Sequence, residues 1–275
     1  MLVAFDFGIT NTDIAIDNEG STQYLSIPTP KENLTKGLIK NIIAQNKISL
    51  SEVSVIGVTG GKSSDLENNI DSIKLIKVNE IDAIGLGARK LYQLADESAL
   101  IVSAGTGTAC VHAEGKSYNH LGGIAVGGGM LEGLGHLLFK NSNGLEINDF
   151  GKKGQRDKLD LLIGDVVNKI GNLSPEITAV NFGQAQSSLA DTMENTAAAL
   201  CNMIGEVIGT MAYLNAILVG SKNVYFTGRT SYLSLVVQGI EERLELAGIK
   251  GQYSDNREFG NVIGVIEVLK KSQKV

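Results

Sequence analysis

One pattern occurs twice in this sequence, and the duplication constrains the fold more than any other feature. Each copy has a short apolar strand, a turn rich in Gly and Thr, and then further strands. The first copy begins at Leu2–Asp6, and the second begins at Ala99–Ser103. Strands and helices follow both copies, which is typical of α/β domains. We therefore predict two α/β domains, at residues 1–97 and 98–275.

The hydrophobic periodicity predicts the elements between the turns. The predicted strands are Leu2–Asp6, Asp13–Asp17, Thr22–Ile27, Val53–Val58, Ile73–Val78, Ala99–Ser103, Ala109–Ala113, Lys116–Leu121 and Asn223–Thr227. The predicted helices are Asn33–Asn46, Glu80–Ala95, Met130–Lys140, Asp157–Ile163, Asp191–Val219, Thr230–Ala247 and Arg257–Lys270. The longest of them carries Gly205 and Gly209 four residues apart, so we expect it to contact another helix closely.

Composition excludes several classes of protein. The chain has 275 residues, and its net charge of -6 does not attract phosphate backbones, so we expect no nucleic-acid partner. Only two cysteines occur, Cys110 and Cys201, which excludes a disulfide framework; we interpret both as core residues. The N-terminal residues form neither a basic leader nor a long apolar run, so we expect a cytoplasmic protein without a membrane span.

Two turns have the composition of phosphate-binding loops. Carboxylates at strand ends can bind Mg²⁺, usually through water, and Gly and hydroxyl residues offer hydrogen-bond donors to phosphate oxygens. The candidates for binding ATP are Asp6, Gly8, Thr10, Asn11 and Thr12 in the first turn, and Gly105, Thr106 and Gly107 in the second. Asp6 is also the candidate metal ligand. Either turn alone could be an ordinary tight hairpin, but the repetition favours a paired phosphate site.

Two further glycine segments fit a nucleotide site. Gly127, Gly128 and Gly129 precede a predicted helix, where first-turn N–H groups bind anions well, although a flexible loop is the alternative. Gly228 follows a predicted strand and could line the adenosine. Neither a Walker A loop nor a Rossmann fingerprint is present, because the required Lys and the required glycine spacing are missing.

Together these segments resemble the actin-like ATPase superfamily and, within it, the type II pantothenate kinases. The motifs that carry the narrower resemblance are Val58-Thr59-Gly60-Gly61, Glu80-Ile81-Asp82-Ala83, Gly105-Thr106-Gly107-Thr108, the segment from Gly122 to Gly135, Asn181-Phe182-Gly183, Gly205-Glu206-Val207 and Phe259-Gly260-Asn261. The resemblance covers nearly the whole chain, and Gly105 to Gly135 is its most specific part.

The resemblance implies a fold of two ribonuclease-H-like domains with ATP in a cleft between them. It implies phosphorylation of the primary alcohol of pantothenate, the first step of coenzyme A biosynthesis, with ATP and Mg²⁺. Glu80 matches the family's catalytic base, and Thr106 and His120 lie where the family contacts its substrate. It also implies a homodimer formed through the helix at 191–219.

The sequence departs from the family at three places. The first turn has Ile9 where the family has Gly, Asp13 replaces a basic residue, and His120 replaces a substrate-binding Arg. Two other functions therefore stay open. The chain could phosphorylate another small alcohol, such as pantetheine or a sugar, or it could be an ATP-binding sensor without transfer activity.

Overall fold

The computed structural model describes residues 1–168, 174–186 and 192–273. Contacts divide the chain into two compact units. The first consists of Met1–Ile101, Val111–His120 and Ser254–Val275, and the second of Val102–Cys110 and Leu121–Tyr253. This division differs from the predicted one because residues 98–101 and 111–120 and the C-terminal segment all group with the first unit.

The first unit contains a six-stranded sheet in the order β3-β2-β1-β4-β6-β5. Its strands are β1 (Leu2–Phe7), β2 (Asn11–Asn18), β3 (Ser21–Pro28), β4 (Val55–Gly60), β5 (Asn69–Ile70) and β6 (Ile73–Lys77). β1, β2 and β3 are antiparallel neighbours, whereas β4 is parallel to both β1 and β6. The carboxyl ends of β1, β4 and β6 therefore lie at one edge of the sheet.

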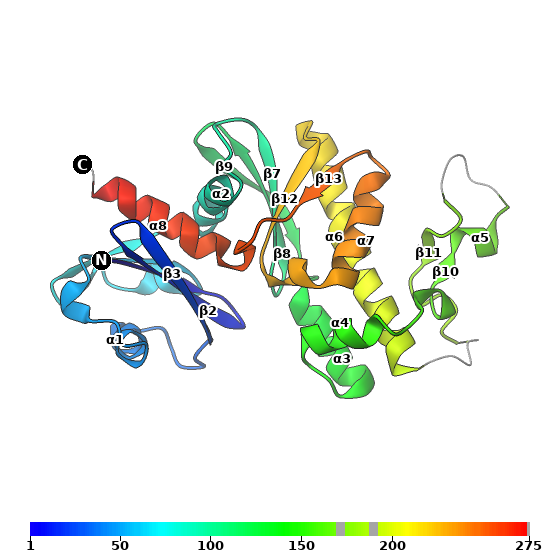
Figure 1. The fold of residues 1–275 in the computed structure, drawn as a ribbon, viewed down its shortest axis with the longest axis horizontal. Coiled ribbons are helices and arrows are strands. Elements are labelled where there is room, and N and C mark those ends of the chain that lie inside the picture. Colours follow the sequence, from blue (N-terminus) through cyan, green and yellow to red (C-terminus); the bar gives the residue numbers. More distant parts are fainter. Residues whose placement is uncertain (169–173, 187–191, 274–275) are drawn as a thin grey trace. The chain divides into compact units, whose positions relative to one another are not determined.

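Helices cover both faces of this sheet (Figure 1). On one face, α1 (Lys36–Gln45) buries its isoleucines against Val3, Phe5 and Ile56. On the other face, α8 (Gly260–Ser272) packs over Leu2 and Ala4 together with Ala83 of α2 (Glu80–Leu91). α2 and α8 approach so closely that a Cβ atom on Gly87 would lie 1.8 Å from the carbonyl oxygen of Gly260.

The other large sheet has the order β13-β12-β7-β8-β9. Its strands are β7 (Ala99–Ala104), β8 (Thr108–Glu114), β9 (Ser117–Ile124), β12 (Asn223–Thr227) and β13 (Lys250–Gln252). Read from β9, this order repeats the order β3-β2-β1-β4-β6 of the first sheet. The duplication predicted from the sequence is therefore confirmed.

The described residues of the second unit form five α-helices: α3 (Gly128–Phe139), α4 (Gly144–Gly151), α5 (Ile163–Val166), α6 (Met193–Val219) and α7 (Ser234–Glu245). The close contact expected of Gly205 and Gly209 is confirmed. A Cβ atom at these positions would lie 2.3 Å from the carbonyl oxygen of Val236 and 2.8 Å from that of Ile240, both in α7.

Among the described residues, α6 alone is long and apolar enough to cross a membrane. However, 67% of its most apolar stretch is buried by the rest of the protein, as in the core helix of a soluble protein. It ends at Gly220, whose φ of +69° is the left-handed conformation usual after a helix. The predicted first residue of this helix, residue 191, lies outside the described residues.

The predicted helix Asp157–Ile163 is wrong. This stretch contains a short 3-10 turn, Arg156–Lys158, and strand β10 (Leu161–Leu162), which pairs with β11 (Thr178–Val180). The reason is Asp160, a fully buried residue whose carboxylate accepts a hydrogen bond from the N–H of Phe182 at 2.8 Å. This long-range bond and the strand pairing override the local helical preference.

Candidate functional site

The first candidate turn is held by threonine hydroxyls. Thr29 donates to the carbonyl oxygen of Gly8 at 2.7 Å, so its only hydroxyl proton is used, and Thr12 must be the donor in the 3.1 Å bond between the two threonines. Thr12 is fully buried, whereas Thr10 is exposed. A Cβ atom on Gly8 would lie 2.7 Å from the carbonyl oxygen of Asn11. Thr12 therefore supports the turn, and Gly8 permits its tight shape.

Asp6, the candidate metal ligand, lies at the end of β1 just before this turn. Its Oδ2 accepts a hydrogen bond from the side-chain amide of Asn261 at 2.9 Å. Gly60 approaches the other oxygen so closely that a Cβ atom there would lie 2.5 Å from Oδ1. Gly60 also has φ = +71°, so glycine is favoured there on two grounds.

The residues around Asp6 fit a hydrated Mg²⁺. In the described part of the chain, no three His, Cys, Asp or Glu side chains lie together as a metal cage. Mg²⁺ rarely uses such cages. It keeps several waters and binds through one or two carboxylates together with the phosphates of a substrate. A single carboxylate at the end of a strand, beside a glycine turn, is a donor set of this kind.

The second candidate turn, Gly105 to Gly107, is tied to two other segments of the second unit. Gly105 donates to the carbonyl oxygen of Gly107 at 2.9 Å across the turn. The Thr230 hydroxyl donates to the carbonyl oxygen of Gly105 at 2.7 Å and accepts from the N–H of Gly128 at 3.0 Å. The turn is thus fixed from the start of α3 and from the segment after β12.

The glycines at the start of α3 serve close packing. Gly127 and Gly129 lie against the turn, where Cβ atoms would come within 2.7 Å of the oxygen of Gly105 and 2.6 Å of Cγ2 of Thr106. The N–H groups of Gly128 and Gly129 donate to the carbonyl oxygens of Gly105 and Thr106 at 2.9 and 3.0 Å. The expectation that these two N–H groups are open to an anion is therefore wrong, because the turn already uses them.

A Thr-Gly pair recurs at matching places in both units. Thr59-Gly60 ends β4, and Thr227-Gly228 follows the same pattern at the end of β12. Gly228 has φ = +89°, and a Cβ atom there would lie 2.3 Å from the carbonyl oxygen of Ala104. Both threonines are buried, and within the described residues neither hydroxyl has a hydrogen-bond partner. The repeated Thr-Gly pair is thus a signal in the sequence that marks the two strand ends as equivalent.

Glu80, the candidate base, is the first residue of α2, as predicted, and it is exposed. The side chain of Asn79 caps the helix by accepting from the N–H of Ile81 at 2.8 Å. Such a cap fixes where the helix begins and therefore where Glu80 lies. A helix N-terminus is also a favourable place for an acidic side chain.

His120 is exposed on β9, which runs beside α2. Arg89 of α2 donates to the carbonyl oxygen of Gly115 at 2.9 Å, and the Tyr118 ring lies against Gly85, where a Cβ atom would come within 2.0 Å of it. Residues further along β9 therefore lie against residues nearer the start of α2. Two strand residues cover about 7 Å, so His120 lies near the level of the first turn of α2, which contains Glu80.

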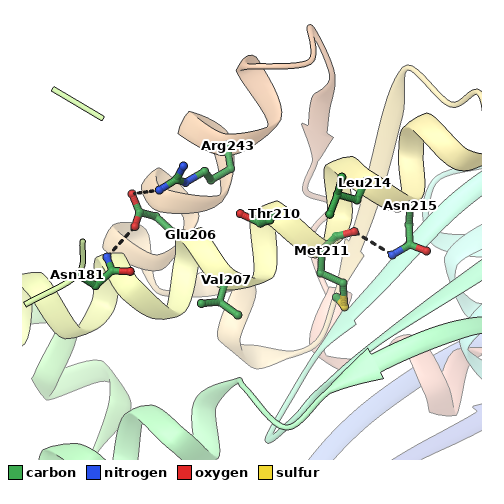
Figure 2. A pocket seen from close by; sticks show the side chains of 8 residues that line it. All are labelled: Asn181, Glu206, Val207, Thr210, Met211, Leu214, Asn215 and Arg243. Carbon is green, nitrogen blue, oxygen red and sulfur yellow. Dashed lines mark hydrogen bonds and ion pairs between the residues drawn. The ribbon is translucent and has the colours of Figure 1, made fainter. Parts of the chain in front are cut away.

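The second unit also has a cavity of about 470 Å³ beside α6, which contains none of the predicted site residues (Figure 2). Its lining residues are Asn181, Glu206, Val207, Thr210, Met211, Leu214, Asn215 and Arg243. Glu206 is buried and accepts from Asn181 at 2.7 Å and from Arg243 at 2.9 Å. A buried carboxylate paired twice in this way anchors the Asn181 segment and α7 to α6.

The two cysteines lie in the core, as predicted. Cys110 and Cys201 are fully buried, and burial raises the pKa of each thiol to about 12. Thiolates are the nucleophilic form of cysteine, so neither residue is suited to nucleophilic chemistry.

Residues 90–235, just over half of the chain, match the model of the Fumble family. The chain belongs to the Fumble family. The resemblance to type II pantothenate kinases predicted from the motifs is thereby confirmed at the level of the family. A type II pantothenate kinase of Staphylococcus aureus (strain USA300) is 29% identical to this Fumble-family chain, over 97% of the chain and 98% of that enzyme.

Solved structures of other proteins share the fold of this Fumble-family chain. An activator of 2-hydroxyisocaproyl-CoA dehydratase from Clostridium difficile, with bound ADPNP, has a TM-score of 0.66 at 13% identity and covers 99% of this chain and 97% of its own. A ROK family glucokinase from Streptomyces griseus, in complex with glucose and AMPPNP, has a TM-score of 0.61 at 11% identity, covering 98% and 99%. The predicted α/β fold of actin-like ATPase type is confirmed.

Proposed function

We propose that this protein is an ATP-dependent kinase that phosphorylates the primary alcohol of pantothenate. The observation that carries the proposal is the duplicated glycine turn, present in both units of a Fumble-family chain and followed in the first unit by Glu80 at the start of α2. The similarity to a type II pantothenate kinase supports the substrate, and the similarity to a glucokinase supports the reaction class.

Phosphoryl transfer depends mainly on positioning and on stabilisation of charge. In the proposed reaction, the turn after Asp6 and the turn after Ala104 each offer hydrogen-bond donors to phosphate oxygens of ATP. Glu80 orients the acceptor hydroxyl and takes its proton as the hydroxyl oxygen bonds to the γ-phosphorus and ADP leaves. Asp6 would hold Mg²⁺, which supplies positive charge to the phosphate oxygens when it is bound.

One observation favours a second substrate. His120 is exposed on β9, at the place where the resembled family has a substrate-binding Arg. An Arg pairs with a carboxylate through two parallel hydrogen bonds, which an imidazole cannot do. Pantetheine has the alcohol of pantothenate but lacks its carboxylate, so it is the alternative acceptor.

The test is a reaction of the purified protein with ATP and Mg²⁺ on pantothenate, pantetheine and a set of sugars, with products identified by mass spectrometry. We expect phosphopantothenate. In the variant His120→Arg, we expect KM to fall for pantothenate and to stay unchanged for pantetheine. Tight ATP binding without any phosphorylated product would contradict the proposal and indicate a nucleotide sensor.

We also infer that the protein is a cytoplasmic homodimer formed through α6. On this helix Leu214, Ile217 and Leu218 are 54%, 60% and 74% exposed, although the helix is otherwise largely buried. A second copy of the same helix would cover these side chains through a two-fold interface.

A further inference from the structure

Asn261 forms a contact that the kinase resemblance does not explain. It is the second residue of α8, and its amide donates to Oδ2 of Asp6 at 2.9 Å, although the two residues are 255 positions apart. Asp6 belongs to the edge of the sheet where the first candidate turn begins. The contact therefore links the start of the last helix to the carboxylate proposed to hold Mg²⁺.

The position of Asn261 is fixed by the packing of α8 along its whole length. Near its start, a Cβ atom on Gly264 would lie 1.9 Å from the carbonyl oxygen of Ala83 in α2. In the middle, Val265 and Leu269 fill the space over Gly57 of β4. At its far end, Lys270 pairs with the buried Asp17 at 2.8 Å. Helix α8 thus presents Asn261 to Asp6 from a rigid support.

The surroundings of Asp6 make a neutral donor useful. Asp13 is the direct partner of Asp6 across β1 and β2, and it is only 4% exposed. Side chains directly opposite each other on antiparallel strands project from the same face, and like charges there are unfavourable. An amide N–H stabilises one carboxylate oxygen of Asp6 without adding a charge, and Gly60, which has no Cβ atom, leaves room for the other.

We propose that Asn261 is a positioning residue that holds the Asp6 carboxylate ready for a hydrated divalent cation; this rests on the proposed function only in assigning the metal to Asp6. Carboxylates that bind metals are generally hydrogen-bonded themselves, and loss of such a partner typically weakens metal affinity by about 10–100-fold. The amide of Asn261 acts on Asp6 alone and contacts neither metal nor substrate.

The test measures nucleotide binding by calorimetry at several Mg²⁺ concentrations, in wild type, Asn261→Ala and Asn261→Leu. The Leu variant keeps the approximate size of the side chain and removes the donor without adding a charge beside Asp6. We expect Mg²⁺ to tighten ADP binding in wild type. Both variants should need about 10-fold or more Mg²⁺ for the same effect, with unchanged affinity for ADP in the absence of Mg²⁺.

Lys270→Ala is the matched control, because it weakens the other end of α8 far from Asp6. If Asn261 only docks the helix, Lys270→Ala will shift the Mg²⁺ dependence of ADP binding as much as an Asn261 variant with the same loss of Tm. That result overturns the proposal. It is also overturned if wild type shows no effect of Mg²⁺. If wild type phosphorylates no alcohol, but both Asn261 variants weaken the Mg²⁺ effect and Lys270→Ala does not, the proposed function fails and the role of Asn261 stands.

Discussion

The hydroxyl of Thr230 donates a hydrogen bond of 2.7 Å to the carbonyl oxygen of Gly105, across 125 positions of sequence. The bond joins the segment after β12 to the middle of the second glycine turn. The bond therefore helps to set the shape of the turn. Of the three turn residues, Gly105, Thr106 and Gly107, only Thr106 has a side chain that could stabilise it.

Thr230→Val should loosen this turn while preserving the volume of the side chain. A lost hydrogen bond costs about 1 kcal/mol, so we expect the Kd for ATP, measured by calorimetry, to rise roughly fivefold. Thr230→Ser keeps the hydroxyl and should bind ATP like wild type. Equal affinity in the Val variant and wild type would show that the bond does not shape the nucleotide site.

Glu80→Gln should reduce kcat by roughly 100-fold or more, because the amide cannot accept the proton of the acceptor hydroxyl. The Kd for ATP should change little, since the residue acts on the acceptor. Asp82→Asn is the matched control in the same exposed helical turn. Normal turnover in Glu80→Gln, or an equal loss in both variants, would remove Glu80 from the role of base.

Stability should fall as pH rises through the pKa of Asp160. Burial raises the pKa of this carboxyl to about 6 in the folded protein, from 3.8. The folded state therefore binds the proton more tightly, and this stabilisation is lost between about pH 4 and pH 6–7. Between pH 5 and pH 8 the free energy of unfolding should drop by about 1 kcal/mol on this account, measured by urea denaturation. Asp160→Asn should abolish that part of the pH dependence, and an unchanged slope would refute the assignment.

Thr59→Val and Thr227→Val should leave stability unchanged or raise it. Both hydroxyls are buried and lack a partner among the described residues, and an unsatisfied buried hydroxyl costs about 1–3 kcal/mol. The matched variants Thr59→Ala and Thr227→Ala also remove a methyl group and should lower Tm. If the Val variants are less stable than wild type, a buried water satisfies the hydroxyls instead.

Leu218→Glu should convert a dimer into a monomer. Leu218 is 74% exposed on α6, so a charge there costs little in a monomer but would be buried in the inferred two-fold interface. Sedimentation velocity at micromolar concentration measures both states. Leu246→Glu, at another exposed leucine outside α6, is the control and should remain dimeric. A wild-type monomer would contradict the interface.

Local patterns were sufficient to predict the duplicated strands and the main helices. The end of β1 at a glycine turn and the start of α2 at Glu80 both follow from signals within a few residues, namely an apolar run and a capping Asn. The close helix–helix contact at Gly205 and Gly209 was also predictable, because residues four positions apart lie on the same face of a helix.

What sequence reasoning missed depends on contacts between distant residues. The N–H groups of Gly128 and Gly129 looked open to an anion, but carbonyl groups more than twenty residues earlier already accept from them. Asn261 was visible as a motif residue, yet nothing near it in sequence indicated Asp6. Asp160 lies in a sequence pattern typical of a helix, but its hydrogen bond with the distant N–H of Phe182 favours a different structure.

The position of α8 in the first unit has a consequence for the order in which the two units can fold during synthesis. Leu2 and Ala4 are synthesised before the second unit, whereas the residues that cover them, Val262 to Leu269, are synthesised after it. Residues 102–110 and 121–253 can already assemble by then. The first unit is therefore begun before the second and completed after it, and its apolar sheet face needs protection from aggregation during translation.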